Sequence, residues 1–345
     1  MKNIIQVQQK IVPDLVDKMY RRFSILSTIQ KYQPVGRRTL SEKLNLTERV
    51  LRSETHLLKA QDLILIKPTG MTLTSVGVDV LSELNVYFSN YTDYHNLAKQ
   101  IKDLYQIKEV HVVPGNSDSD LSVKVEIGRI AGQLLEKQLF NDAIVAVTGG
   151  STMASVSDAM SALPFDVLFV PARGGLGENV VFQANTICST MAHRTGGSYT
   201  TLYVPDNVSE LTYQNLLKEP TVIQTLEKIK DSQITIHGIG DALKMAKRRQ
   251  SSRAVIEKLQ HHNAVGEAFG YYFDQHGQII HKVNTIGLQL EEVRLKEHNF
   301  AVAGGCSKGS AIKAYLKIAP KNTVLITDEE AAKMIVAEKH SLKNK

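Results

Sequence analysis

The 345-residue sequence is poor in cysteine and has no long apolar run. Its two cysteines, Cys188 and Cys306, are far apart and in no spacing typical of a metal site, which argues against a disulfide scaffold, a zinc site and secretion. No stretch approaches the roughly 18 consecutive apolar residues of a membrane span, and the polar N-terminus lacks the apolar core of a signal peptide. We therefore expect a cytoplasmic protein with no membrane contact and no metal.

The positive charge is concentrated in one part of the chain. Residues 1–70 hold 13 Lys or Arg and 6 Asp or Glu, whereas the other 275 residues hold 28 and 29. The net charge of +6 thus resides entirely in the N-terminal segment. Such asymmetry indicates a module that contacts nucleic acid or a membrane, although a solvated basic surface gives the same count.

The N-terminal segment has the pattern of a winged helix-turn-helix. Helices are expected over Pro13–Gln30, over Thr39–Leu44, and from Thr47, a suitable N-cap, to about Gln61. The segment LILIKPTGMTLT then predicts a hairpin that turns at Pro68-Thr69-Gly70. A helix, a short turn, a longer helix and a hairpin together predict this fold.

The third helix has two chemically different sides. Leu51, Thr55 and Leu58 share one side, and Arg49, Arg52, His56 and Lys59 share the other. The cationic side suits phosphates and guanine edges in a major groove. Glu48 and Glu54 could read cytosine or repel phosphate, and a protein partner is the alternative. The expected DNA-binding residues are Arg37, Arg38, Lys43, Thr47, Arg49, Arg52, Ser53, His56, Lys59 and Lys67.

Residues 74–105 carry apolar side chains at spacings of three and four without proline, which predicts one long helix. Its apolar stripe would need the next domain or a partner chain for burial. Because a two-fold DNA reader matches a palindromic site as a dimer, we expect a homodimer or homotetramer. The alternative is a helix that belongs wholly to the next domain.

From residue 109 onward, β-branched runs alternate with helical patterns, which predicts a doubly wound, mostly parallel α/β sheet. The expected strands are Glu109–Val113, Ala143–Val147, Val167–Val170, Tyr199–Val204, Gln233–Ile236, Gly266–Tyr272, Ala301–Ala303 and Thr323–Ile326. Ligands bind such sheets at the carboxyl ends of the strands.

Four loops at these strand ends are rich in glycine or cations: AVTGGSTMASV, FVPARGGLGENVVFQAN, HGIGDALKMAKRRQ and AVAGGCSKGSAI. Glycines allow close approach of a phosphate, and helix N-termini, Arg173 and Lys308 supply donors or charge. Neither a Walker loop nor a dinucleotide fingerprint is present. Each loop alone could be an ordinary turn, but together they predict a small anionic ligand.

Two sets of motifs resemble one known family. TLSEKLNLTERVLRSETHLLKAQDLI is similar to the DNA-binding half of the DeoR/SorC group of bacterial sugar-responsive regulators. VTGGSTMASV, PARGGLGENV, AVGEAFGYYFD and AVAGGCSKGSAIKAYL resemble the SorC-type sugar-binding domain, which is itself similar to phosphosugar isomerases. The opening VPDLVDKMYRRFSIL favours the glycolytic branch of the family.

The resemblance implies a repressor of a glycolytic operon whose effector is fructose 1,6-bisphosphate, with a sugar monophosphate as the alternative. By resemblance, Ser151, Thr152, Arg248 and Lys308 hold one phosphate, Arg173 and Gln183 the other end, and Glu267 meets the sugar hydroxyls. The full expected effector set is Gly150, Ser151, Thr152, Arg173, Gly174, Gln183, Arg248, Glu267 and Lys308.

The last alternative is an isomerase-like enzyme, for which Glu267 or Asp241 would have to move a proton. Neither lies in a recognisable catalytic pattern, and an enzyme has no need of a basic winged helix, so no catalytic residues and no cofactor are expected. The expected division is a winged helix over residues 1–73, a helical connector over 74–108 and an effector domain over 109–345.

Overall fold

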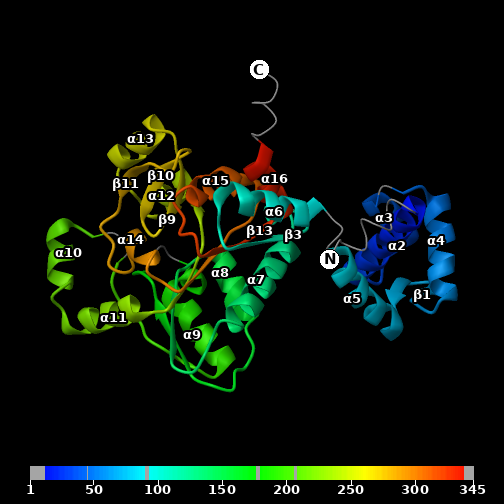
Figure 1. Cartoon of the computed structure of the whole chain (residues 1–345), viewed down its shortest axis with the longest axis horizontal. Helices are drawn as coiled ribbons and strands as arrows, with labels where there is room; N and C mark the ends of the chain where they lie inside the picture. The colour runs from blue at the N-terminus through cyan, green and yellow to red at the C-terminus, as the bar shows by residue number, and fades with distance from the viewer. Residues whose placement is uncertain (1–11, 45, 90–92, 176–178, 206–207, 338–345) are drawn as a thin grey trace. The chain divides into compact units, whose positions relative to one another are not determined.

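The computed structural model describes residues 12–44, 46–89, 93–175, 179–205 and 208–337. The chain forms two compact units that meet in sequence between His95 and Asn96. Figure 1 draws the first unit in blue and the second from cyan to red. Each unit has its own buried core.

The first unit is the predicted winged helix-turn-helix. Its elements are α2 (Pro13–Tyr32), α3 (Arg37–Leu44), α4 (Glu48–Ala60), β1 (Ile64–Lys67), β2 (Gly70–Leu73) and α5 (Ser75–Ser89). The hairpin pairs antiparallel, with Lys67 opposite Gly70 at the turn. Leu51 and Leu58 of α4 are buried against Ile25 and Leu40, as the spacing predicts.

The predicted connector helix is divided between the units. Residues 75–89 form α5, and α6 (Asp93–Tyr105) follows; residues 90–92 lie outside the described part. Leu81 of α5 packs into the core of the winged helix. Leu97 and Ile101 of α6 pack into the core of the second unit. The expected separate connector over 74–108 is therefore replaced by two helices, each of which buries apolar side chains in a unit of this chain, whereas Val76 of α5 stays 46% exposed.

In the described part of the second unit, seven strands form a parallel sheet in the order β3-β13-β12-β7-β4-β5-β6. They are β3 (Glu109–Val113), β4 (Ala143–Val147), β5 (Val167–Pro171), β6 (Ser198–Tyr199), β7 (Ile234–His237), β12 (His298–Val302) and β13 (Thr323–Asp328). The expected strand over Tyr199–Val204 was wrong beyond Tyr199, since Thr200–Val204 make no ladder with β5.

Helices cover both faces of this sheet, which confirms the doubly wound architecture. The helices of the second unit are α7 (Leu121–Glu136), α8 (Ser151–Asp158), α9 (Ala184–Thr195), α10 (Glu210–Leu216), α11 (Pro220–Asp231), α12 (Ala242–Arg248), α13 (Arg253–His261), α14 (Leu290–Val293), α15 (Gly309–Leu316) and α16 (Glu329–Val336). Of these, α12 and α13 pack on the strands β8, β9 and β11 of a second sheet, described below, rather than on the parallel sheet. Alternation within β4 shows the two faces: Val145 and Val147 pack toward α7, α8 and α9, whereas Ala146 faces the opposite core.

A smaller antiparallel sheet was not predicted. It has the order β11-β10-β9-β8 and consists of β8 (Gly240–Asp241), β9 (Ala264–Ala268), β10 (Tyr271–Asp274) and β11 (Ile279–Lys282). The single strand expected over Gly266–Tyr272 is thus a hairpin. Its turn lies at Phe269 and Gly270, both with positive φ (53° and 83°), where the chain cannot remain extended.

Candidate functional site

A cavity of about 270 Å³, partly open to solvent, lies where loops from the two sheets of the second unit meet. Its wall contains every residue of the predicted effector set: Gly150, Ser151, Thr152, Arg173, Gly174, Gln183, Arg248, Glu267 and Lys308. The four loops singled out in the sequence therefore converge on one volume, at the carboxyl ends of the parallel strands.

The loop after β4 gives the cavity the N-terminus of α8. Gly150 is the N-cap with φ 130°, a backbone conformation that favours glycine. A Cβ on Gly149 would lie 2.6 Å from the carbonyl oxygen of Phe182, so this position also requires glycine. The first-turn amides of α8 have no intrahelical acceptor and no side-chain cap, which suits them to an anion beside Ser151 and Thr152.

Lys308 and Arg248 bring positive charge to this wall, and Lys244 of α12, absent from the predicted set, joins them. Burial, together with the nearby ammonium groups of Lys124 and Lys244, lowers the pKa of Lys308, against the opposing effect of Asp118 and Asp328. A phosphate would relieve the crowding of cations.

Two aspartates hold the loop that carries Lys308. The wholly buried Asp328 accepts hydrogen bonds from the amides of Gly305 (2.6 Å) and Ser117 (2.8 Å). Asp118 accepts from the amide of Ser307 at 2.7 Å and from its hydroxyl at 3.0 Å. The loop is therefore fixed before a ligand arrives, which lowers the entropic cost of binding.

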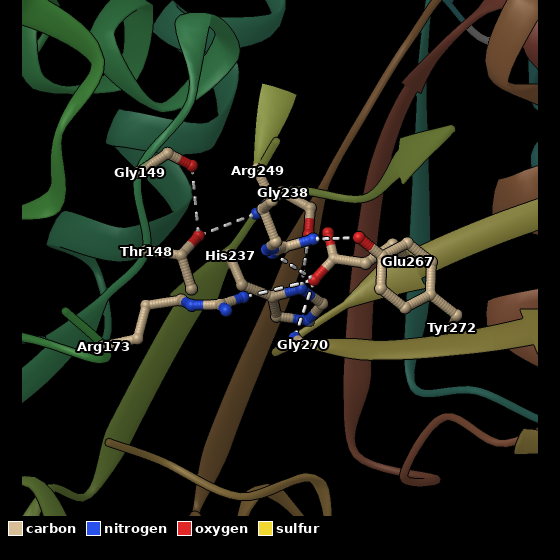
Figure 2. A network of polar contacts seen from close by, with 9 residues as sticks. All are labelled: Thr148, Gly149, Arg173, His237, Gly238, Arg249, Glu267, Gly270 and Tyr272. Atoms are coloured by element: carbon tan, nitrogen blue, oxygen red, sulfur yellow. Dashed lines mark hydrogen bonds and ion pairs between the residues drawn. The ribbon is translucent and has the colours of Figure 1, made fainter. Parts of the chain in front are cut away.

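Glu267 lies between two arginines on the inner wall of the cavity (Figure 2). Its Oε1 accepts from Nη1 of Arg173 at 3.1 Å, Nη2 of Arg249 at 2.9 Å and the amide of Gly270 at 2.6 Å. Arg249 also donates to the hydroxyl of Tyr272 at 2.8 Å. A carboxylate tied to two guanidinium groups is an acceptor fixed in place rather than a carrier of protons.

Behind the cavity wall, His237 is buried and neutral at physiological pH, because desolvation lowers its pKa to about 4. Nδ1 lies 3.0 Å from the carbonyl oxygen of Gly238, and Nε2 lies 2.9 Å from the hydroxyl of Tyr315. The amide of Gly238 donates to the hydroxyl of Thr148 at 3.1 Å, as Figure 2 shows. The hydroxyl of Thr148, which lines the cavity, in turn donates weakly to the carbonyl oxygen of Gly149 at 3.5 Å.

The sequence pattern missed Thr148, Lys244 and Arg249. Thr148 is the first polar residue after a buried strand, and Lys244 lies three residues after the helix cap Asp241, so both had a usable signal. Arg249 had no such signal, because a basic triplet such as Lys247-Arg248-Arg249 usually lies on a solvated surface. The structure separates the three: Lys247 is exposed, Arg248 half-buried and Arg249 buried.

The predicted DNA-binding residues form an exposed cationic surface on the first unit. Leu51, Thr55 and Leu58 of α4 are buried, so the opposite side faces outward. The exposed members are Arg38, Lys43, Thr47, Arg49, Arg52, Ser53, His56, Lys59 and Lys67. The hydroxyl of Thr47 accepts weakly, at 3.4 Å, from the amide of Val50 and so caps α4 as expected.

Two charged residues differ from the simple pattern. Arg37 is half-buried rather than exposed. Glu54 does not face outward: it pairs with Arg22 of α2 at 2.8 Å and with Arg21 at 3.7 Å, which ties the first helix to α4. The two roles considered for Glu54, reading cytosine and repelling phosphate, are corrected to a structural ion pair.

Within the described ranges, no group of three or more His, Cys, Asp or Glu side chains could hold a metal ion. In the same ranges, no helix is long and apolar enough to cross a membrane.

Two family models match the chain. The model described as "Putative sugar-binding domain" matches residues 89–337, and the model described as "CggR N-terminal DNA binding domain" matches residues 18–88. The division agrees with the two compact units. The first unit is therefore a DNA-binding domain, and the second is a sugar-binding domain.

Curated relatives match over nearly the full length. A central glycolytic genes regulator of Priestia megaterium is 46% identical over 98% of this chain and 99% of its own length. One from Bacillus subtilis is 44% identical over 98% of this chain and 100% of its own. Both are regulators, and the chain is likewise a transcriptional regulator rather than an enzyme.

Solved structures agree with this assignment. A SorC-family transcriptional regulator from Enterococcus faecalis is 43% identical, with a TM-score of 0.67, over 70% of this chain and 100% of that one. The full-length sorbitol operon regulator SorC from Klebsiella pneumoniae, 15% identical with a TM-score of 0.65, covers 88% of this chain and 94% of its own, and shows the shared fold. The chain thus belongs to the SorC family of transcriptional regulators and, within it, to the central glycolytic genes regulators.

Proposed function

We propose that this chain is a repressor of a glycolytic operon that releases its operator when a phosphorylated sugar, fructose 1,6-bisphosphate, fills the cavity of the second unit. The observation that carries the proposal is the convergence of Arg173, Arg248, Lys308 and the N-terminus of α8 on one cavity. Their charges and amides suit phosphates, and Glu267 supplies an acceptor for sugar hydroxyls.

Several features favour a bisphosphate over a monophosphate. Cationic side chains reach the cavity from three separate segments: the loop after β5, the helix α12 and the loop before α15. A single phosphate dianion does not need so many partners. The names of the curated relatives add the link to glycolytic genes.

The proposed switch is a shift between two states of a homodimer or homotetramer. The operator favours one state, and the sugar phosphate binds the other more tightly. A coupling free energy of about 1–3 kcal/mol weakens DNA binding roughly 5- to 150-fold, which suffices for a metabolic response. A two-fold oligomer would place two copies of α4 on a palindromic operator.

The proposal is tested with a labelled duplex taken from upstream of the glycolytic operon of the same genome. We expect fluorescence anisotropy to show tight binding that fructose 1,6-bisphosphate weakens within that 5- to 150-fold range, with no such response on a scrambled duplex. A response to fructose 6-phosphate or glucose 6-phosphate alone would reject the bisphosphate. Equal affinity for both duplexes in all conditions would reject the operator-specific repressor.

Two substitutions separate base recognition from phosphate contact on the first unit. Arg52→Ala, on the exposed side of α4, is expected to cost about 1–3 kcal/mol on the operator and little on the scrambled duplex. Lys67→Ala, in the wing, is expected to weaken both duplexes similarly and to lower the salt slope by about one. Anisotropy titrations at several salt concentrations measure both effects, and interchanged results would contradict these roles.

The lowered pKa of Lys308 predicts how effector affinity depends on pH. The charged ammonium binds phosphate, so binding raises this pKa, and the affinity that Lys308 adds is fully present below the pKa of the free protein. That contribution is lost as pH rises through the pKa of the complex. Calorimetric titration from pH 7.5 to 10 should show the fall, because sugar phosphates are already dianionic there. Lys308→Arg stays charged, so its affinity for the sugar phosphate should fall less with pH than that of wild type. An equal fall in both proteins would contradict the role of Lys308.

A further inference from the structure

One ion pair of the cavity joins groups that a ligand must itself contact. Arg173 follows β5 of the parallel sheet, and Glu267 lies in β9 of the antiparallel sheet. Their side chains are 9% and 5% exposed, and both line the cavity. Nη1 of Arg173 is bonded to the carboxylate of Glu267 at 3.1 Å (Figure 2).

The pair changes the energy of anion binding at Arg173. A phosphate that approaches the guanidinium also approaches the negative charge of Glu267, and this site is largely removed from water. Repulsion between like charges is strong under such conditions. For inorganic phosphate, repulsion from Glu267 therefore offsets much of the attraction to Arg173. A phosphate ester with a neighbouring hydroxyl group does not, because the hydroxyl donates to the carboxylate while the phosphate contacts the arginine.

The carboxylate is held so that it cannot turn away when an anion arrives. The amide of Gly270 donates to it at 2.6 Å, and Arg249, whose side chain is 0% exposed, donates at 2.9 Å. Arg249 is fixed in turn by the hydroxyl of Tyr272. The turn is closely packed: a Cβ at Gly270 would lie 3.2 Å from Nη2 of Arg173, and the φ of 83° favours glycine.

We propose that the Arg173–Glu267 pair is a selectivity filter that rejects inorganic phosphate and admits phosphate esters bearing a hydroxyl group, with Arg249 as the residue that positions Glu267. This inference rests on the proposed function, since it takes the ligand of the cavity to be a sugar phosphate. In this proposal the carboxylate of Glu267 repels inorganic phosphate, whereas it accepts a hydrogen bond from a phosphate ester that carries a hydroxyl group. A sensor of this kind reports a sugar phosphate in the presence of abundant free phosphate.

The test is calorimetric titration of the full chain with inorganic phosphate and, separately, with fructose 1,6-bisphosphate. Glu267→Gln keeps the shape of the side chain and removes its charge. We expect inorganic phosphate to bind this variant about tenfold or more tightly than wild type, and the sugar phosphate to bind about tenfold or more weakly. Glu257→Gln, which removes the charge of an exposed pair with Arg253 on α13, is the matched control and should change neither affinity.

The opposite signs distinguish a filter from simple damage, because a poorly folded variant binds both ligands more weakly. Arg249→Lys keeps the charge but loses the geometry that holds Glu267 and Tyr272. Like Glu267→Gln, it should bind inorganic phosphate more tightly and fructose 1,6-bisphosphate more weakly than wild type. If Glu267→Gln and Arg249→Lys, with unchanged circular dichroism, leave the affinity for inorganic phosphate at the wild-type value, the filter is wrong.

Failure of the proposed function looks different. A wild-type chain that binds no sugar phosphate rejects that function, whatever the variants do. In that case the phosphate titrations still decide on the ion pair: tighter binding to Glu267→Gln supports repulsion by the carboxylate, and unchanged binding overturns it.

Discussion

Replacing Arg248 by alanine is expected to weaken the binding of fructose 1,6-bisphosphate by roughly 10- to 100-fold. Arg248 lines the same cavity as Lys308, and a charge-assisted hydrogen bond to phosphate contributes about 1.5–3 kcal/mol. The variant should still bind operator DNA with wild-type affinity, because the cationic surface of α4 belongs to the other unit. The repressor would then remain on its operator at effector concentrations that release the wild type.

Lys247→Ala provides the matched control for this prediction. Lys247 is the neighbour of Arg248 on the same helix, is exposed and is absent from the cavity wall. Its loss removes the same charge from the surface and should leave effector affinity within about twofold. Calorimetry measures binding, and anisotropy with effector measures release. Equal loss in both variants, or loss of DNA binding in the folded Arg248→Ala protein, would contradict the separation of roles.

Replacing Leu51 by alanine is expected to destabilise the first unit by about 2–5 kcal/mol. Leu51 is 0% exposed and packs among the residues that join α4 to α2 and α3. In a unit of this size the unfolding midpoint should fall by about 10 °C or more. Operator binding should be lost near that lower temperature, while the binding of sugar phosphate in the second unit persists.

Differential scanning calorimetry with and without fructose 1,6-bisphosphate checks this expectation. The transition that the ligand shifts should be unchanged by Leu51→Ala, and the other should move to lower temperature. Ser53→Ala, two residues along the exposed side of α4, is the control and should alter stability by less than about 0.5 kcal/mol. A single transition that moves as a whole would show that the two units unfold together.

Much of the arrangement follows from local sequence signals. Strand ends followed by glycine and a hydroxyl, as at Gly150 and Ser151, predict a turn into a helix, and parallel strands bring such turns to one edge of the sheet. The chain therefore places Arg173, Arg248 and Lys308 around one cavity, as expected. The buried side of α4 was likewise predicted, because a period of 3.6 residues requires Leu51, Thr55 and Leu58 to share a face.

What escaped prediction depends on tertiary contacts. Arg249 looks like a surface cation until the antiparallel sheet, with Glu267 and Tyr272, encloses it. That sheet was missed because Phe269, an aromatic residue in the middle of the strand expected over Gly266–Tyr272, gave no sign of its positive φ. The predicted long helix over 74–105 had an uninterrupted apolar stripe, yet its two halves pack into different cores. Periodicity specifies which side of a helix is buried, but not what buries it.

The central claim, that the cavity of the second unit binds a phosphorylated sugar, is tested most directly by the thermal midpoint of the purified chain during titration. A ligand that binds only the folded state stabilises it by about 2.7 kcal/mol at 100 times its dissociation constant. We expect fructose 1,6-bisphosphate to raise the midpoint, fructose 6-phosphate, glucose 6-phosphate and dihydroxyacetone phosphate to do less, and Arg173→Ala or Lys308→Ala to remove the shift. An unchanged midpoint with every sugar phosphate would contradict the account and leave a DNA-binding regulator whose signal is of another chemical class.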